Sequence, residues 1–520
     1  MRWWGFTTWV AIVNKRRFYL NTAVMTGCSL LLRLMGIFFR IFISNRVGAE
    51  GMGLYQLVLS VHILGSTFAT GGLITAITRL CGERLAYRDN HGVRKLLRIG
   101  SLFSLVVGGV SALLLYFGAP FIGTWLGDSR AANAVAVSGL GLPFIGVSAC
   151  LQGYFLARRK AGPPCVAQIA EQIVRIGSIG GMLATLWDGD LGSACVLILL
   201  GDTLAEAVSC LVFVLAYRRD RLPTADRSLP PQKLLKPLLH ITLPLTGSRY
   251  ISTGLRTVEN TLVPARLALC TGSKALALAG FGAVKGMALP LIFFPSALLM
   301  TLTGLLIPEL SDAHALGQRK QVSRLVEQTL HVTLPGAILV GGLFTLVGKA
   351  LGQWLYNDPL VGVLLQVLGP LTPVMYVDSI ATGMLKGLGQ QVHSFWYSLA
   401  DSLVRIGLIW WLLPRWGLAG FLFVMLVSNL LTCLLNTGRL LEISRARLRW
   451  RRWVFRPVLA AVIAGGIGAL LPLGGLGSIV GVAILFSVLY VALILWFRCF
   501  TKEDWHTLTT RKHKEKTAVG

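Results

Sequence analysis

Two arginines lie inside a run of sequence that is otherwise as apolar as a bilayer. They stand in the stretch Arg33-Leu-Met-Gly36-Ile-Phe-Phe-Arg40. Arg33 and Arg40 are seven residues apart, about two turns of an α-helix, so both side chains project from one face. A cation at membrane depth is costly and normally faces the protein interior or a wet cavity. The pair therefore predicts a binding site for an anion.

Three more cations lie at similar depth in the second half of the chain. Arg249 and Arg256 are again seven residues apart, and Lys285 lies in the next apolar segment. Glu259 is the nearby acid and can neutralise one cation. The surplus positive charge favours an anionic ligand over snorkelling of these side chains to the membrane surface, which Arg40 and Arg249 could reach. We therefore expect a substrate site that comprises Arg33, Arg40, Arg249, Arg256, Lys285 and Glu259.

Other intramembrane charges occur as acid–arginine pairs. Arg175 follows Glu171 by four residues, and Arg405 follows Asp401 by four. This is the favourable order for an ion pair within one helix, so we expect both pairs to be structural. Three further acids lie in apolar segments, namely Asp202, Glu206 and Asp378. Each is compatible with proton transfer, Na⁺ binding or packing, so coupling to Na⁺ or H⁺ stays open.

The composition is that of a multi-pass membrane protein. Of 520 residues, 54% are hydrophobic and only 14% are charged, whereas about a quarter are charged in soluble domains. The formal net charge is +27. In this setting we interpret the basic residues as loop charges that set orientation, and we expect no nucleic-acid partner.

About fourteen segments are long and apolar enough to cross a membrane, beginning with approximately 18–45 and 52–80. Lys and Arg accumulate in alternate loops, which predicts that both termini are cytoplasmic. The predicted fold is therefore an all-α polytopic protein of the plasma membrane. The outer loops are too short for an extracellular domain.

The sequence contains an internal duplication. Glu171-Gln-Ile-Val-Arg175-Ile-Gly177 recurs 230 residues later as Asp401-Ser-Leu-Val-Arg405-Ile-Gly407. Near the start of each half, Thr26-Gly27 matches Thr246-Gly247 at an offset of 220. Two six-helix lobes in the same membrane orientation form a parallel repeat, an architecture that transporters use.

The repeat divides the chain into seven parts. We expect an interfacial lead-in (1–17), an N-lobe of six helices (18–217), a cytoplasmic linker (218–236), a C-lobe of six helices (237–440), a basic loop (441–455), two additional helices (456–498) and a basic cytoplasmic tail (499–520). Prolines in three segments, Pro143, Pro290, Pro295, Pro370 and Pro373, predict bends.

No motif indicates an enzyme. The sequence has no P-loop, nucleophile elbow or His-x-x-x-His. Its nine cysteines are scattered and form no Cys-x-x-Cys, so neither a metal site nor a disulfide framework is expected. We predict no catalytic residue, no metal and no cofactor.

Several motifs resemble the stage V sporulation protein B group of polysaccharide-biosynthesis flippases, within the multidrug/oligosaccharidyl-lipid/polysaccharide superfamily. The first is Arg33-Leu-Met-Gly36 with Arg40 and Gly48-Ala-Glu-Gly-Met-Gly-Leu-Tyr-Gln56. Others are Val258-Glu-Asn-Thr-Leu-Val-Pro-Ala-Arg-Leu267, Gly286-Met-Ala-Leu-Pro290 and Leu306-Ile-Pro-Glu309-Leu310. The matches cover nearly the whole chain.

The family is also similar to lipid II flippases, in which arginines of the first helix line the cavity that receives a pyrophosphate. That pattern carries over to Arg33 and Gly36, whereas Arg40 lies one residue further on and Glu259 stands where the sporulation group more often has Asp. The resemblance implies a flippase for an undecaprenyl-pyrophosphate-linked saccharide, used in cell-wall, spore-envelope or polysaccharide synthesis.

The expected partners are that anionic lipid-linked saccharide, membrane lipid and envelope-synthesis proteins. Three alternatives stay open, and one of them is a non-transporting scaffold for envelope assembly. A drug or cation antiporter of the same superfamily predicts a cavity with net acid. A membrane-embedded glycosyltransferase or polymerase predicts catalytic carboxylates at a sizeable outer loop. The sequence does not identify the saccharide, the coupling ion or the oligomeric state.

Overall fold

The computed structural model of the chain describes residues 15–220, 235–472 and 474–500. Most of the predicted lead-in (1–17), linker (218–236) and tail (499–520) lies outside these ranges. The described residues are almost entirely helical and contain no strand.

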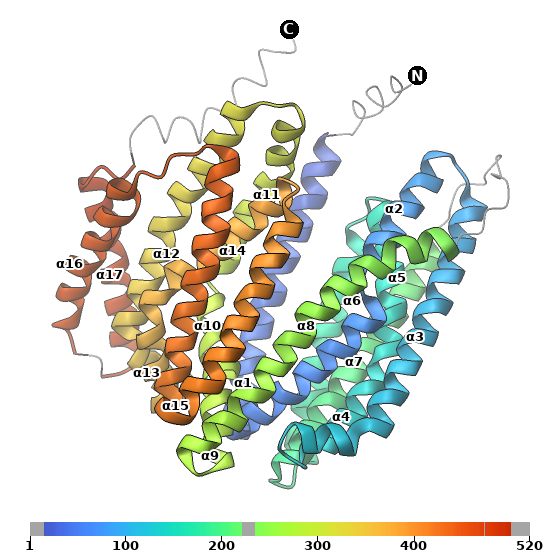
Figure 1. Cartoon of the computed structure of the whole chain (residues 1–520), viewed down its shortest axis with the longest axis horizontal. Helices are drawn as coiled ribbons and strands as arrows, with labels where there is room; N and C mark the ends of the chain where they lie inside the picture. The colour runs from blue at the N-terminus through green and yellow to red at the C-terminus, as the bar shows by residue number, and fades with distance from the viewer. Residues whose placement is uncertain (1–14, 221–234, 473, 501–520) are drawn as a thin grey trace. The chain divides into compact units, whose positions relative to one another are not determined.

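Nine α-helices cover the described residues up to 281 (Figure 1). They are α1 (Lys15–Thr70), α2 (Leu73–Ala86), α3 (Asn90–Trp125), α4 (Ala131–Ser138), α5 (Leu142–Ala157), α6 (Gly162–Thr185), α7 (Leu191–Arg219), α8 (Leu235–Thr271) and α9 (Lys274–Phe281).

Eight α-helices follow in the described part from residue 289 onward. They are α10 (Leu289–Phe293), α11 (Ser296–Ala315), α12 (Arg319–Tyr356), α13 (Pro359–Leu368), α14 (Thr372–Gly387), α15 (Gln391–Ser444), α16 (Arg456–Ala469) and α17 (Leu476–Trp496).

Two of the longest helices are broken at a glycine. α1 bends at Gly48, with φ 71°, and α15 bends at Gly417, with φ 55°. Both values lie in the left-handed region, where a Cβ atom is unfavourable. α1 therefore consists of two legs that diverge from Gly48 (Figure 1), and these legs carry the predicted spans 18–45 and 52–80.

Ion pairs hold the residues just after this bend. Arg130 Nη2 lies 2.8 Å from Glu50 Oε1, just beyond Gly48, and 2.7 Å from Asp128 Oδ2. Burial alone would raise the pKa of Asp128, but the hydrogen bonds from Arg130 outweigh it and lower that pKa. The same bonds raise the pKa of Arg130. The α3–α4 loop is thereby tied to α1.

The predicted proline bends occur at equivalent places in the two repeats. A 3₁₀ turn at Gly139–Gly141 precedes Pro143, and a 3₁₀ turn at Gly369–Leu371 precedes Pro373. The segment near Pro290 contains a π-helical stretch, Gly282–Ala288. The two 3₁₀ turns separate α4 from α5 and α13 from α14.

Ten helical stretches of the described chain are long and apolar enough to cross a bilayer. α6 and α8 are not among them, because polar side chains lower their mean hydropathy. The prediction of an all-α polytopic membrane protein is confirmed, while the total of fourteen spans and the cytoplasmic termini stay predictions.

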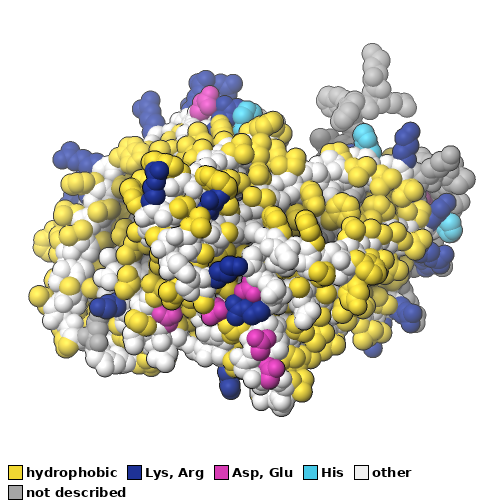
Figure 2. Space-filling view, turned by 60° about the horizontal axis from the view of Figure 1, so that its bottom comes forward, with side chains coloured by type: hydrophobic (Ala, Val, Ile, Leu, Met, Phe, Trp, Pro, Cys, Tyr) yellow, Lys and Arg dark blue, Asp and Glu magenta, His cyan; other side chains and the backbone are white. Residues whose placement is uncertain are grey.

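The surface agrees with a membrane location. Hydrophobic side chains cover much of the face seen in Figure 2, while charged side chains gather along its middle and at its edges. On α3, Leu114, Phe117 and Phe121 are 65%, 76% and 76% exposed. Apolar side chains exposed at consecutive turns of one helix suit contact with lipid tails.

The chain divides into two compact units. Unit 1 comprises residues up to Gly282 together with Ile409–Gly417, and unit 2 comprises Ala283–Leu408 and the residues from Leu418 onward. Unit 1 is centred on Ile77, Leu96, Tyr154 and Phe213 of α2, α3, α5 and α7.

In unit 2, one apolar cluster joins α11, α12 and α14, and another packs α16 and α17 against α12. Unit 1 includes α8 and α9, which the sequence repeat places at the start of the second lobe. The lobe boundaries therefore stay a prediction.

Candidate functional site

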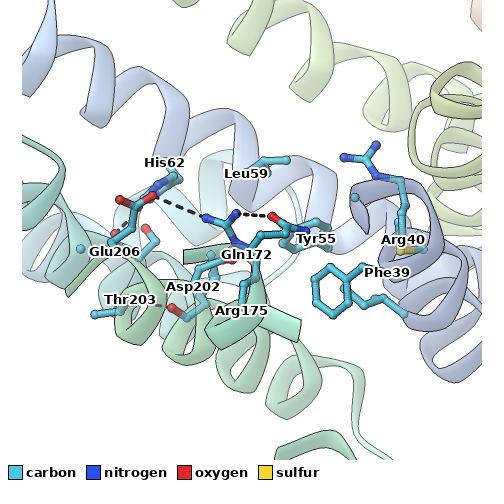
Figure 3. Close-up of a pocket in the computed structure, with 16 residues that line it drawn as sticks. Phe39, Arg40, Tyr55, Leu59, His62, Gln172, Arg175, Asp202, Thr203 and Glu206 are labelled. Atoms are coloured by element: carbon cyan, nitrogen blue, oxygen red, sulfur yellow. Dashed lines mark hydrogen bonds and ion pairs between the residues drawn. The ribbon is translucent and has the colours of Figure 1, made fainter. Parts of the chain in front are cut away.

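A cavity of about 300 Å³ lies within unit 1 (Figure 3). Both legs of α1 contribute to its wall, the first through Gly36, Phe39 and Arg40 and the second through Tyr55 and His62. The opposite wall comes from α6 and α7, with Gln172, Arg175, Asp202, Thr203 and Glu206. The bend at Gly48 thus lets a single helix line the cavity twice.

Arg175 is the centre of the polar side of this cavity. Its Nη2 lies 2.8 Å from Glu171 Oε1 and 3.6 Å from Glu206 Oε1, and its Nε lies 2.7 Å from Asp202 Oδ1. Nη1 also donates to Gln172 Oε1 at 3.0 Å. Figure 3 shows the guanidinium between Gln172 and Glu206. Three carboxylates therefore share one cation.

The remaining polar residues of the cavity are spread along its length. Arg40 lies at the opposite end of the pocket from Glu206 (Figure 3). His62 Nδ1 is 3.0 Å from the carbonyl oxygen of Ser138. Among described residues, no acid forms an ion pair with Arg40. The Arg40 end can therefore receive an anion, whereas the Arg175 end carries an excess of acid.

The residues predicted to bind substrate lie at different places. Arg40 lines the cavity, while Arg33 is exposed on the same leg of α1 and is not among the lining residues. Arg256 is exposed on α8 and Glu259 is buried there. Arg249 Nη1 donates to the carbonyl oxygen of Gly71 at 2.8 Å.

Lys285 lies in unit 2, in the π-helical stretch Gly282–Ala288, and is half-buried. Because the other predicted substrate residues belong to unit 1, the assembly of all six into one site stays a prediction.

Unit 2 contains the repeat counterpart of the Arg175 cluster. Arg405 Nη2 lies 2.9 Å from Asp401 Oδ2 on α15, and Arg405 Nε donates to Ser428 Oγ at 3.0 Å. At the repeat offset of 230, Asp202 and Glu206 correspond to Thr432 and Asn436. Asn436 Nδ2 donates to Asp378 Oδ1 at 2.8 Å. The acid–arginine pair is common to both units, but the extra acids differ.

Sequence reasoning did not foresee the gathering of Asp202 and Glu206 on Arg175. A signal was available, because these two acids are four residues apart and so share one face of their helix. Gln172, Tyr55 and His62 were not anticipated as cavity residues, since uncharged or weakly basic side chains give no comparable signal.

Comparison with known proteins identifies relatives over most of the chain. A model of the family described as polysaccharide biosynthesis protein matches residues 19–314. Stage V sporulation protein B of Bacillus subtilis is 23% identical over 511 residues, covering 94% of this chain and 97% of that protein. Lipid II flippase MurJ of the same organism is 24% identical over 344 residues, covering 60% and 61%.

Solved structures show the same fold. A lipid II flippase MurJ in an inward closed conformation superimposes with a TM-score of 0.72 at 14% identity, covering 92% of this chain and 99% of that one. An inward-facing multidrug transporter of the MATE family gives a TM-score of 0.59 at 13% identity, covering 81% and 100%.

These findings agree with the helical membrane fold described above. The match to the family model extends over more than half of the chain. The chain is a multi-pass membrane protein and belongs to the polysaccharide biosynthesis protein family.

Proposed function

We propose that the chain is a flippase that moves an undecaprenyl-pyrophosphate-linked saccharide from the cytoplasmic to the outer leaflet by alternating access. Two relatives support this proposal. One is a lipid II flippase by name, and the solved structure that superimposes over 92% of the chain is also a lipid II flippase. That the substrate of this chain is a lipid-linked saccharide is likewise part of the proposal.

The observation that carries the proposal is the position of Arg40. This cation lines a cavity within a membrane protein and forms no ion pair with an acid in the described ranges. A pyrophosphate offers several anionic oxygens, and guanidinium groups bind such oxygens through charge-assisted hydrogen bonds. We propose that Arg40 binds the pyrophosphate, with Arg33, Arg249, Arg256 and Lys285 as further cationic contacts and Glu259 as their counter-charge.

A second candidate function is transport of an organic cation. It is favoured by Asp202 and Glu206, which line the same cavity, and by Glu171 next to them. Arg175 and Arg40 offset two of these three charges, so an excess of one negative charge is left when all are ionised. The antiporter alternative therefore keeps a physical basis, and its substrate would bind at the Glu206 end.

The experiment is a flipping assay in proteoliposomes that contain a fluorescent undecaprenyl-pyrophosphate disaccharide. Arg40→Gln removes one charge-assisted contact, worth about 1.5–3 kcal/mol. Because about 1.4 kcal/mol corresponds to a factor of ten, we expect the rate to fall by roughly tenfold to a hundredfold.

A matched control comes from the same helix. Arg46 lies six residues beyond Arg40, is exposed, and packs over the Phe42 ring with its Cζ 5.9 Å from the ring centroid. Arg46→Gln should flip lipid at the wild-type rate. Equal rates for Arg40→Gln and the wild type would contradict the assignment, and transport of organic cations alone would favour the second candidate.

A further inference from the structure

The second leg of α1 and helix α8 meet along a row of polar side chains. On α8 the row comprises Thr246, Arg249, Thr253, Thr257 and Asn260, spaced three or four residues apart and therefore on one face of the helix. Ser60, Thr67, Gly71 and Gly72 lie opposite them. We refer to these nine residues as the polar seam.

Hydrogen bonds occur at successive levels of the polar seam. At one end, Asn260 Nδ2 donates to Ser60 Oγ at 2.8 Å, and Thr257 Oγ1 donates to the Ser60 carbonyl oxygen at 3.2 Å. At mid-height, Thr67 Oγ1 and Thr253 Oγ1 are 3.5 Å apart.

The other end of the polar seam lies at the break between α1 and α2. Gly72 N–H donates to Thr246 Oγ1 at 3.2 Å, and Arg249 Nη1 donates to the Gly71 carbonyl oxygen at 2.8 Å. Gly71 has φ 25°, and a Cβ atom there would lie 1.9 Å from Thr246 Oγ1. At Gly72 a Cβ atom would lie 2.6 Å from the Leu245 Cβ. The approach of α8 thus depends on two consecutive glycines.

This contact differs from the apolar cores of the protein. Seven of the nine residues of the polar seam have polar side chains, and the other two are glycines. The core of unit 1, in contrast, contains Leu96, Tyr154, Phe155 and Phe213. Interhelical hydrogen bonds are individually weak within membranes, because separated partners find other groups to bond. A seam built from them can part and re-form with little cost in packing.

The position of α8 in the repeat adds a second observation. Thr246-Gly247 matches Thr26-Gly27, so α8 is the first helix of the second repeat by sequence. In the structure it belongs to compact unit 1, beside the second leg of α1 (Figure 1). The seam therefore holds the first helix of one repeat against a helix of the other.

We propose that the polar seam is a latch, closed in this structure, that must part during each transport cycle. The proposal rests on the alternating-access function proposed above and adds the residues that hold one closed state. It also assigns Thr246 and Arg249 as positioning residues, which fix α8 at the α1–α2 break.

The test is a reversible cross-link across the seam in the full-length protein. Thr67→Cys/Thr253→Cys places two thiols where hydroxyl oxygens are 3.5 Å apart, so the sulfurs must approach by about 1.5 Å to form a disulfide bond. A protease site inserted between residues 220 and 235 reports the cross-link, since the cleaved fragments stay joined when the bond has formed. The two single variants, treated with the same oxidant, are the controls.

We expect the oxidised double variant to flip the fluorescent lipid at least tenfold more slowly than either single variant, and to recover fully with a reductant. A fully cross-linked protein that flips at the rate of the single variants would overturn the latch. In that case the proposed function would still stand, because the single variants report it independently.

A second readout does not depend on transport. Thr257 is 3% exposed, so a cysteine at this position reacts with a maleimide only while the seam is open. In Thr67→Cys/Thr253→Cys/Thr257→Cys, the alkylation rate at residue 257, followed by mass spectrometry, should fall at least tenfold when the 67–253 bond forms. An unchanged rate would overturn the latch even if the flipping assay gave no signal.

Discussion

Removal of the Arg175 guanidinium offers the sharpest test of the cavity electrostatics. Arg175→Met keeps most of the side-chain volume but leaves three carboxylates without their shared cation, at distances that are now 2.8, 2.7 and 3.6 Å. These carboxylates are only 17–19% exposed. Removing one partner of a buried ion pair leaves an uncompensated charge and costs about 3–5 kcal/mol.

The assay is thermal unfolding in detergent at pH 7.5, followed by intrinsic fluorescence. With roughly 2–4 °C per kcal/mol, the melting temperature of Arg175→Met should fall by on the order of 10 °C. Arg405→Met leaves Asp401 with Ser428 as a hydrogen-bond donor and should lose less stability. Wild-type stability of Arg175→Met would refute this reasoning.

Three further predictions concern local structure. Gly48→Ala places a Cβ atom at φ 71° and should cost about 1–2 kcal/mol of folding stability, measured as a lower melting temperature. The control is Gly109→Ala, inside α3 with open space around it, which should not lower the melting temperature. Glu171→Gln should mainly lower the folded yield on size-exclusion chromatography, and normal yield with lost flipping would instead make Glu171 a transport residue. Because the pKa of Asp128 is lowered in the folded protein, its ionised carboxylate stabilises the fold above the unfolded pKa near 3.9, and this stability is lost as pH falls through the folded pKa. Asp128→Asn should therefore reduce the change of melting temperature with pH below about pH 4. An unchanged pH dependence would contradict the Arg130 pairing as its cause.

Much of the fold could be predicted because hydropathy and repeats are properties of the chain itself. The acid–arginine spacing at Glu171 and Arg175 places both groups on one helical face, and the structure shows them 2.8 Å apart. The proline bends follow from a missing N–H. Gly48 was not anticipated as a break within one helix, because nothing in the neighbouring sequence distinguishes a glycine with a positive φ from an ordinary helical glycine.

The site was harder to predict because it depends on which helices pack together. Arg33 and Arg40 share a helical face, yet only Arg40 lines the described cavity. Arg249 and Arg256 both lie in the same apolar segment of the sequence. The close approach of α8 to Gly71 gives Arg249 a backbone carbonyl oxygen as its partner. Asp202 and Glu206 reach Arg175 through the packing of α6 on α7, a contact that helix periodicity alone does not specify.

The central claim is that this chain binds a lipid-linked pyrophosphate through its intramembrane cations. Native mass spectrometry of the purified protein with an undecaprenyl-pyrophosphate disaccharide tests it directly, comparing the wild type with Arg33→Ala/Arg40→Ala/Arg256→Ala. The account predicts that the wild type retains the lipid and that the triple variant, inserted and folded, does not. Equal retention by both proteins would contradict the assigned cations, and binding of organic cations in place of the lipid would contradict the flippase itself.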